Sequence, residues 1–308
     1  MKFNHRTLLT LWAAWLAGSL SVCSAKEPAA EAQPSTKVPG EDWVRLSHGS
    51  NGQLQAMQTA IVRYEGFYQP SGRKVVVDLI GAVHIGDAKY YQLLNQRFTQ
   101  YQALLYELVA PEGTVIQKGA KASARHPLGA MQAGTKDLLD LQHQLELVDY
   151  TRPNFVHADM SPEQFFESMN NRGESIVQMI MRMTGHAIAM QGTPEGPEAG
   201  SEVEILFALF SSDRARRLKV AMAKQLAKSE SMLAGFGGEQ GSTIINERNR
   251  VALEVLEREL KAGRQQVGVF YGAGHLKDMD ERLQRDFGLK PTNQEWLTAW
   301  DLRPANER

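Results

Sequence analysis

Two stretches of this sequence, far apart in the chain, repeat one pattern: an apolar run, then Gly-Ala-x-His, then a segment with helical spacing. The first is "VVVDLIGAVHIGD", residues 75–87, and the second is "VGVFYGAGHLKD", residues 267–278. A short apolar run that ends at glycine is typical of a buried strand, and the residues after each histidine have helical periodicity. We call each of these strand–Gly-Ala-x-His–helix segments a corner. Because strands that run into helices in this way pair in parallel, the two corners predict a fold built on parallel strands.

The flanking segments support this interpretation. Residues 54–69 predict a strand that forms a hairpin with residues 74–80, since Pro-Ser-Gly at 70–72 supplies the turn. Residues 88–101 predict a helix and residues 103–109 a second buried strand, which completes a strand–helix–strand unit. The C-terminal part predicts a helix, a strand, a helix and a last strand, at residues 245–262, 266–271, 277–287 and 295–302. We therefore expect an α/β (or α+β) fold with a mostly parallel sheet made by the N- and C-terminal segments.

Residues 115–240, between these sheet-forming ends, indicate mostly helices that would form a cap. Ser161 as N-cap and Pro162 at the first helical position predict one helix start. The basic helix at residues 213–234 is interpreted as a solvated face. Methionines 179, 181, 183 and 190 would belong to the core or line a groove for an apolar peptide. We expect one domain, residues 43–308, that carries this central insertion.

The first residues have the pattern of an export signal. Lys2 and Arg6 precede an apolar run at residues 8–22, and small residues precede a cleavage site after Ala25. The run is shorter than the roughly 20 residues of a membrane span, so we expect no span in the mature chain. We expect the cleaved protein in the periplasm, with residues 26–42 as a disordered tether.

Cys23 is the chain's one cysteine, and it lies just before the predicted cleavage site. Acylation of Cys23, as in a lipoprotein, is the alternative to simple cleavage, although the preceding valine stands where a small residue is wanted. In the cleaved chain, no cysteine remains for a disulfide, a thiolate metal site or a nucleophile.

The charge balance argues against one class of partner. The chain has 34 Lys and Arg against 35 Asp and Glu, for a formal net charge of −1. A nucleic-acid-binding protein needs a basic surface that neutralises phosphates, so we do not expect nucleic acid as a partner.

Three side chains stand where a parallel sheet binds its ligands, beyond the carboxyl ends of strands. His84 and His275 follow the two apolar runs, and Glu107 stands near the end of the strand at residues 103–109. Two imidazoles and a carboxylate suit a catalytic divalent metal with an open position for water. Asp87 or Asp278 would orient a metal-bound imidazole. The structural alternative is a pair of glycine corners with hydrogen-bonded histidines at the edge of the sheet.

The motifs "GAVHIGD", "LLYELV", "INERN" and "VFYGAGHL" together resemble the TraB family, which includes the GumN-like proteins and the TIKI metalloproteases. The family's two G-x-x-H motifs, its strand-end glutamate and its Arg-Asn pair fall on His84, His275, Glu107 and Arg248-Asn249. The resemblance covers roughly residues 74–110 and 244–285, and no motif ties the central helices to it. Many members carry Ser or Thr where this chain has Ala82.

The resemblance implies a fold related to erythromycin esterase and the haem-binding ChaN proteins. For the TIKI branch it implies manganese- or cobalt-dependent cleavage of peptides, and zinc is the alternative ion on general grounds. With the family in view, Asn249 becomes a candidate metal ligand or water-orienting group, and Arg248 a partner for an oxyanion or a carboxylate.

Two functions follow as hypotheses. The first is an exported metal-dependent hydrolase, a peptidase, in which His84, Glu107 and His275 hold the ion and Asp159, beside His157, reaches the site from the cap. Its general base stays open between Glu107 and a second carboxylate. The second is a non-catalytic periplasmic binder of haem or a peptide, with Tyr271 and His84 as iron ligands. The chain contains neither H-E-x-x-H nor G-x-S-x-G, which argues against a zincin or an α/β-hydrolase serine nucleophile.

Overall fold

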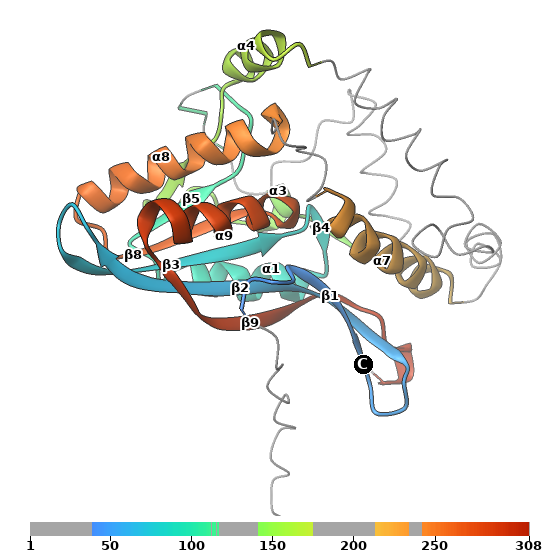
Figure 1. Ribbon diagram of the computed structural model, residues 1–308. Helices are drawn as coiled ribbons and strands as arrows, with labels where there is room; N and C mark the ends of the chain where they lie inside the picture. Colours follow the sequence, from blue (N-terminus) through green and yellow to red (C-terminus); the bar gives the residue numbers. More distant parts are fainter. Residues whose placement is uncertain are drawn as a thin grey trace, which may run out of the picture. The chain divides into compact units, whose positions relative to one another are not determined.

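A long antiparallel hairpin, β2 (Leu54–Tyr68) and β3 (Arg73–Ala82), begins the sheet of this protein (Figure 1). The hairpin turns at Gly72, whose φ of 63° is a backbone conformation that glycine adopts without steric cost. The structure is a computed structural model that describes residues 39–111, 113, 114, 116, 141–174, 213–233 and 242–307. The predicted hairpin is confirmed, and it leads directly into the first Gly-Ala-x-His corner.

The other described strands are β1, β4, β5, β6, β7, β8 and β9, at Val44–His48, Ile85–Gly86, Ala103–Tyr106, Gln142–His143, Phe155–His157, Gln266–Gly272 and Lys290–Asp301. The described α-helices are α1, α3, α4, α7, α8 and α9, at Ala88–Phe98, Gln144–Leu147, Pro162–Asn171, Arg214–Leu233, Arg248–Lys261 and Ala273–Phe287. A π-helical turn, η1 (Thr243–Glu247), leads into α8, and a 3₁₀ turn, η2 (Ala305–Glu307), ends the described chain.

The sheet has a parallel half and an antiparallel half. Its strand order is β1-β2-β3-β8-β5-β7, and β9 also pairs with β2. Strands β3, β8, β5 and β7 pair in parallel, whereas β1, β2 and β9 join antiparallel. The expected α/β fold on parallel strands from both ends of the chain is therefore confirmed, and the antiparallel strands extend the sheet on the side away from β5.

Helices cover both faces of the sheet. Val75, Val77 and Leu79 of β3 belong to one apolar cluster with α8 and α9, whereas Ile80 and Ala82 belong to a second cluster with α1. This division follows from the strand periodicity, because successive side chains point to opposite faces. Figure 1 shows α8 and α9 on one side of the strands and α1 on the other. Residues Val38–Arg308 form one compact unit.

The described parts of the predicted insertion differ from a separate cap in two respects. Strand β7 joins the main sheet as the parallel neighbour of β5, where Phe155 packs against Phe98 and Tyr106. Helix α7 buries Leu218 and Lys219, and Lys219 Nζ donates to Asp87 Oδ1 at 2.6 Å. The interpretation of α7 as a solvated basic face is thus wrong for Lys219. The predicted start of α4 is confirmed, with Ser161 accepting a hydrogen bond from Gln164 in a capping box.

The two corners are neighbours but do not have the same shape. Strands β3 and β8 pair in parallel, with Gly81 opposite Tyr271 and Ala82 opposite Gly272. After β3 the chain forms the short strand β4 before α1 begins, so His84 lies in the connection. After β8 helix α9 begins at once, so His275 lies in its first turn and not in a loop, contrary to the expectation of a helix at 277.

Several predictions fall on residues outside those that the structure describes. They are the signal peptide at residues 1–25, most of the tether at 26–42, and the methionine stripe at 179–190. Within the described ranges, no helix is both long and apolar enough to cross a membrane.

Candidate active site

A buried cluster of charged and polar side chains lies where β5 and β8 end, at the first turns of α8 and α9. Its members are Glu107, Asp159, Arg248, Asn249 and His275, all of them singled out by the sequence. Asp159, Arg248, Asn249 and His275 are each buried, and the side chain of Glu107 is 13% exposed. The cluster occupies the carboxyl edge of the parallel strands, which is where such sheets bind ligands.

Glu107 reaches the cluster because it directly follows β5. Its backbone N–H donates to Phe270 O of β8, and its Oε2 accepts from Gly272 N at 2.6 Å. Glycine at position 272 leaves room for the carboxylate, since a Cβ there would stand 3.2 Å from Glu107 Oε2. The glycine of the second corner therefore lets a carboxylate approach the first backbone N–H groups of α9, where a negative charge is stabilised.

Arg248 is the centre of the cluster. Its guanidinium binds Asp159 through two bonds, Nε to Oδ1 at 2.9 Å and Nη2 to Oδ2 at 2.6 Å. Nη2 also donates to Glu107 Oε1 at 2.7 Å, and Nη1 lies 3.5 Å from His275 Nε2. Asp159 has a further bond from Met160 N at 2.8 Å and a fully buried side chain. Asp159 therefore belongs to the site because it binds and orients the guanidinium of Arg248.

The turn η1 leads into the helix end that carries Arg248 and Asn249. Arg248 and Asn249 begin α8 directly after η1, and π-helical turns often occur at functional sites. Ser242 caps η1 by accepting from Ile245 N at 3.3 Å. Thr243 N donates to the carboxylate of Glu174 at 3.1 and 3.2 Å. These bonds fix the entry into α8, so Arg248 and Asn249 are held from one helix end.

The side chain of Asn249 binds His275 and Asp278. Its Oδ1 lies 2.7 Å from His275 Nδ1, and its Nδ2 donates to His275 O at 2.9 Å and to Asp278 Oδ2 at 2.7 Å. Both ends of the amide are therefore engaged within the protein. In this structure Asn249 binds the imidazole of His275, and its role as a metal ligand or water-orienting group stays a prediction.

The protonation states of the cluster follow from burial and neighbouring charge. Burial lowers the pKa of His275, and Glu107 only partly opposes this. Burial by itself would raise the pKa of Glu107, but the charges of His275, Arg248 and His84 together lower it to about 2. The permanent charge of Arg248 and the hydrogen bond from Gly272 N both favour the ionised form of Glu107. Burial would lower the pKa of Arg248, but its bonds to Asp159 and the charge of Glu107 raise it.

We expect acid to remove the stabilisation that Glu107 provides. Its pKa of about 2 in the folded state lies below the ordinary 4.5, so this contribution is complete above about pH 4.5 and is lost as the pH falls toward 2. The free energy of unfolding of the wild type and of Glu107→Gln, measured by urea titration from pH 6 to pH 2.5, should therefore converge in acid. Glu254→Gln, in an exposed ion pair of α8, is the control. A gap that stays constant with pH would contradict the pairing of Glu107.

His84 lies at the edge of the cluster. Its side chain is exposed, its backbone oxygen accepts from Gln144 N at 2.9 Å, and its charge acts on Glu107. Asp87 does not orient it in this structure, because the Asp87 carboxylate binds Lys219 Nζ and Asp301 N. A ring-to-ring approach of His84 and His275 close enough to share one ion stays a prediction.

Two of the three predicted metal ligands lie close together. His275 Nε2 and Glu107 Oε1 are 3.6 Å apart. Two tetrahedral ligands with bonds of about 2.1 Å lie about 3.4 Å from each other. No group of three His, Cys, Asp or Glu side chains among the described residues is placed to hold an ion. A cation that binds this pair must replace the hydrogen bond from Arg248 Nη2 to Glu107 Oε1.

Sequence patterns missed the polar residues that line the first corner. Gln144 and Tyr150 are buried there, and Gln144 Nε2 donates to the Tyr150 hydroxyl at 2.8 Å. Burial and the charge of Glu107 raise the pKa of Tyr150, although the bond from Gln144 opposes them. No motif marks these residues, because only the pairing of β4 with β6 brings them beside His84.

Tyr271 and His157 take structural roles. The Tyr271 side chain is completely buried, and its hydroxyl donates to Ala158 O. His157 Nε2 lies 2.6 Å from Leu108 O, next to Tyr106. The arrangement does not support Tyr271 as an iron ligand, so the proposed haem site loses one of its two residues.

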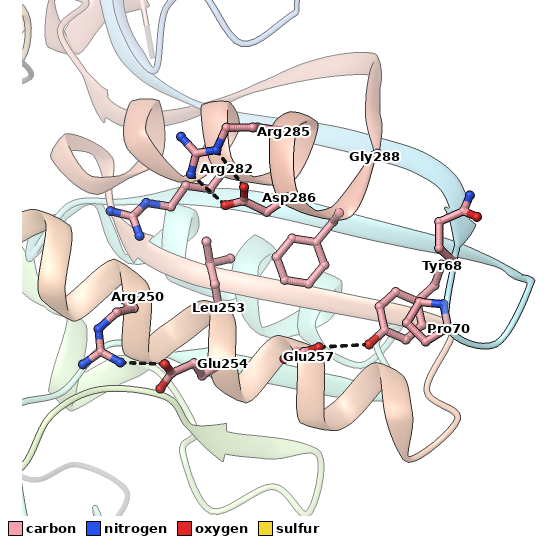
Figure 2. Close-up of a pocket in the computed structure, with 12 residues that line it drawn as sticks. Tyr68, Pro70, Arg250, Leu253, Glu254, Glu257, Arg282, Arg285, Asp286 and Gly288 are labelled. Carbon is pink, nitrogen blue, oxygen red and sulfur yellow. Dashed lines mark hydrogen bonds and ion pairs between the residues drawn. The ribbon is translucent and has the colours of Figure 1, made fainter.

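A groove of about 590 Å³ lies apart from the cluster, between α8, α9 and the end of β2 (Figure 2). Leu253, Phe287 and Tyr68 are among its lining residues. Its three arginines bind carboxylates of the protein: Arg250 binds Glu254, Arg282 binds Asp278 and Arg285 binds Asp286. The groove therefore has no excess of positive charge that would select an anion.

The chain matches no protein-family model, no curated protein and no solved structure with which it was compared.

Proposed function

We propose that this protein is an exported metal-dependent hydrolase, and that peptides are its substrates. The observation that carries the proposal is the pair formed by Glu107 Oε1 and His275 Nε2, 3.6 Å apart in a buried site at the carboxyl ends of parallel strands. The resemblance of the two corners to the TraB family supports the same conclusion. Export is part of the proposal and rests on the pattern of residues 1–25.

Glu107 and His275 would hold the ion, with His84 as the third ligand from the neighbouring corner. A bound divalent cation supplies an activated water molecule and polarises the substrate carbonyl. The protein's contribution is to exclude bulk water around Glu107 and to keep that carboxylate ionised. It also holds the Nε2 side of His275 toward Glu107.

Arg248 has a second part in the proposal. Its bonds to Asp159 fix the plane of the guanidinium, so it stays in the site when Glu107 binds a cation. Nη1, which faces His275, is then a donor for the oxygen of a substrate carbonyl or a peptide carboxylate.

The test is hydrolysis of fluorescein-labelled casein by the mature protein, recovered from the periplasm and stripped of metal with a chelator. We expect an N-terminus near Lys26, no hydrolysis without metal, and activity restored by manganese, cobalt or zinc. Elemental analysis of the untreated protein should find about one equivalent of a divalent ion. Absence of both bound metal and metal-dependent cleavage would overturn the proposal.

A further inference from the structure

We infer that Asn249 and Asp278 are a positioning pair for His275: they hold its proton on Nδ1 and so leave the lone pair of Nε2 facing Glu107. The inference concerns the tautomer of one imidazole. It rests on the proposed function only where it takes the lone pair of Nε2 to bind a metal ion. The sequence indicates Asp278 as a residue that orients an imidazole, but it does not indicate Asn249 for this role, since Asn249 and His275 are brought together by the contact between α8 and α9.

The amide of Asn249 has one orientation that satisfies its neighbours. Its NH₂ group donates to His275 O at 2.9 Å and to Asp278 Oδ2 at 2.7 Å, and both partners only accept. The Oδ1 atom is therefore the one that faces His275 Nδ1, at 2.7 Å. A carbonyl oxygen cannot donate, so Nδ1 carries the hydrogen.

Asp278 makes this orientation hard to reverse. Its Oδ1 accepts from Asn246 Nδ2 at 2.9 Å, and its Oδ2 accepts from Arg282 Nε at 2.8 Å as well as from Asn249. The carboxylate is thus fixed on two sides. A flipped Asn249 amide would set its oxygen against this carboxylate and against a carbonyl oxygen, and would turn an NH₂ group toward His275.

The consequence is a neutral imidazole whose unprotonated Nε2 faces the cluster. With the hydrogen on Nδ1, His275 Nε2 is an acceptor or a ligand, and it lies 3.5 Å from Arg248 Nη1 and 3.6 Å from Glu107 Oε1. Metal-binding histidines usually donate their other N–H to a carboxylate or a carbonyl. Here a neutral amide stands between imidazole and carboxylate, so Asp278 directs the ring without accepting its proton.

Nitrogen NMR tests the inference without any substrate. We would label the histidines with ¹⁵N and record the ring-nitrogen shifts at pH 8, using His275→Gln to assign the His275 signals. The wild type should show protonated Nδ1 and unprotonated Nε2. Asn249→Leu keeps a similar shape but removes the acceptor of the Nδ1 hydrogen, so the population of the Nε2–H tautomer should rise.

Asn246→Leu is the matched control, because it removes another asparagine from the same carboxylate without touching the imidazole. It should keep the wild-type tautomer. An Nε2–H tautomer in the wild type would overturn the inference, and this outcome decides the question even if Asn249→Leu does not fold. An unchanged tautomer in folded Asn249→Leu would overturn it as well.

A separate experiment asks whether the lone pair of His275 Nε2 binds metal, by measuring the affinity for manganese with calorimetry. Loss of a group that orients a metal ligand typically weakens binding by about 10–100-fold, so Asn249→Leu should lose this much and Asn246→Leu should not. If the wild type shows the Nδ1–H tautomer but binds no metal, the positioning pair stands and the proposed function fails. If metal binds but the wild-type tautomer is Nε2–H, the positioning pair fails and the proposed function stands.

Discussion

Glu107→Gln is expected to lower the rate of hydrolysis by about 100-fold or more and to abolish stabilisation by manganese or cobalt. Glutamine keeps the shape of the side chain and one acceptor oxygen but loses the charge that balances a cation. The metal-free fold should survive, because Arg248 keeps its two bonds to Asp159. Loss of one hydrogen bond to a charged group costs about 1.5–3 kcal/mol. Thermal melts with and without metal, together with casein hydrolysis, measure both effects.

Glu254→Gln is the control for this prediction, since Glu254 forms an exposed ion pair with Arg250 on α8. It should leave both the melt and the hydrolysis rate unchanged. The prediction is contradicted if Glu107→Gln melts far below the wild type with and without metal and the wild type gains nothing from added ions. Glu107 would then be a structural partner of Arg248 only.

Arg248→Met is expected to produce the largest loss of stability among these variants. It removes the guanidinium that Glu107 and Asp159 share, and leaves two buried carboxylates without that cation. Breaking a buried ion pair from one side costs about 3–5 kcal/mol. At about 2–4 °C per kcal/mol, the melting midpoint should fall by about 6–20 °C. Protonation of the stranded carboxylates relieves part of this cost, so the deficit relative to the wild type should shrink as the pH falls.

Arg250→Met, two residues further along α8, is the matched control. Arg250 pairs with Glu247 and Glu254 on the surface, and its side chain is 48% exposed. Exposed pairs contribute about 0–1 kcal/mol, so this variant should melt close to the wild type. Equal losses for Arg248→Met and Arg250→Met would show that the buried cluster is not a centre of stability.

Local pattern was enough to predict three of the four strands in the parallel half of the sheet, β3, β5 and β8. The hairpin, the strand–helix–strand unit and strand β8 follow from apolar runs that stop at turn residues, whereas the pairing of β3 with β8 is seen only in the structure. Such runs are decided by neighbours within a few positions, which a sequence displays. The same patterns placed His84, Glu107 and His275 at strand ends, and so near one edge of the sheet.

Patterns failed where an element's partner is distant in the chain. Strand β7 is a three-residue strand that is recognisable only once it lies beside β5. Lys219 has the sequence context of a solvated residue, and becomes buried because α7 brings it to Asp87. The second corner differs from the first because α9 starts directly after Gly272, whose backbone N–H binds Glu107.

The chemistry of the site divides in the same way. Residue types and spacing determine which groups are present: two histidines, two carboxylates, an arginine and an asparagine near the ends of parallel strands. Only the tertiary structure decides their partners, with Arg248 between Asp159 and Glu107 and with Asn249 between His275 and Asp278. The physical reason is that hydrogen bonds and charge pairs act over a few ångströms in space. The residues they join here lie up to 141 positions apart in the chain, so no local pattern records the choice.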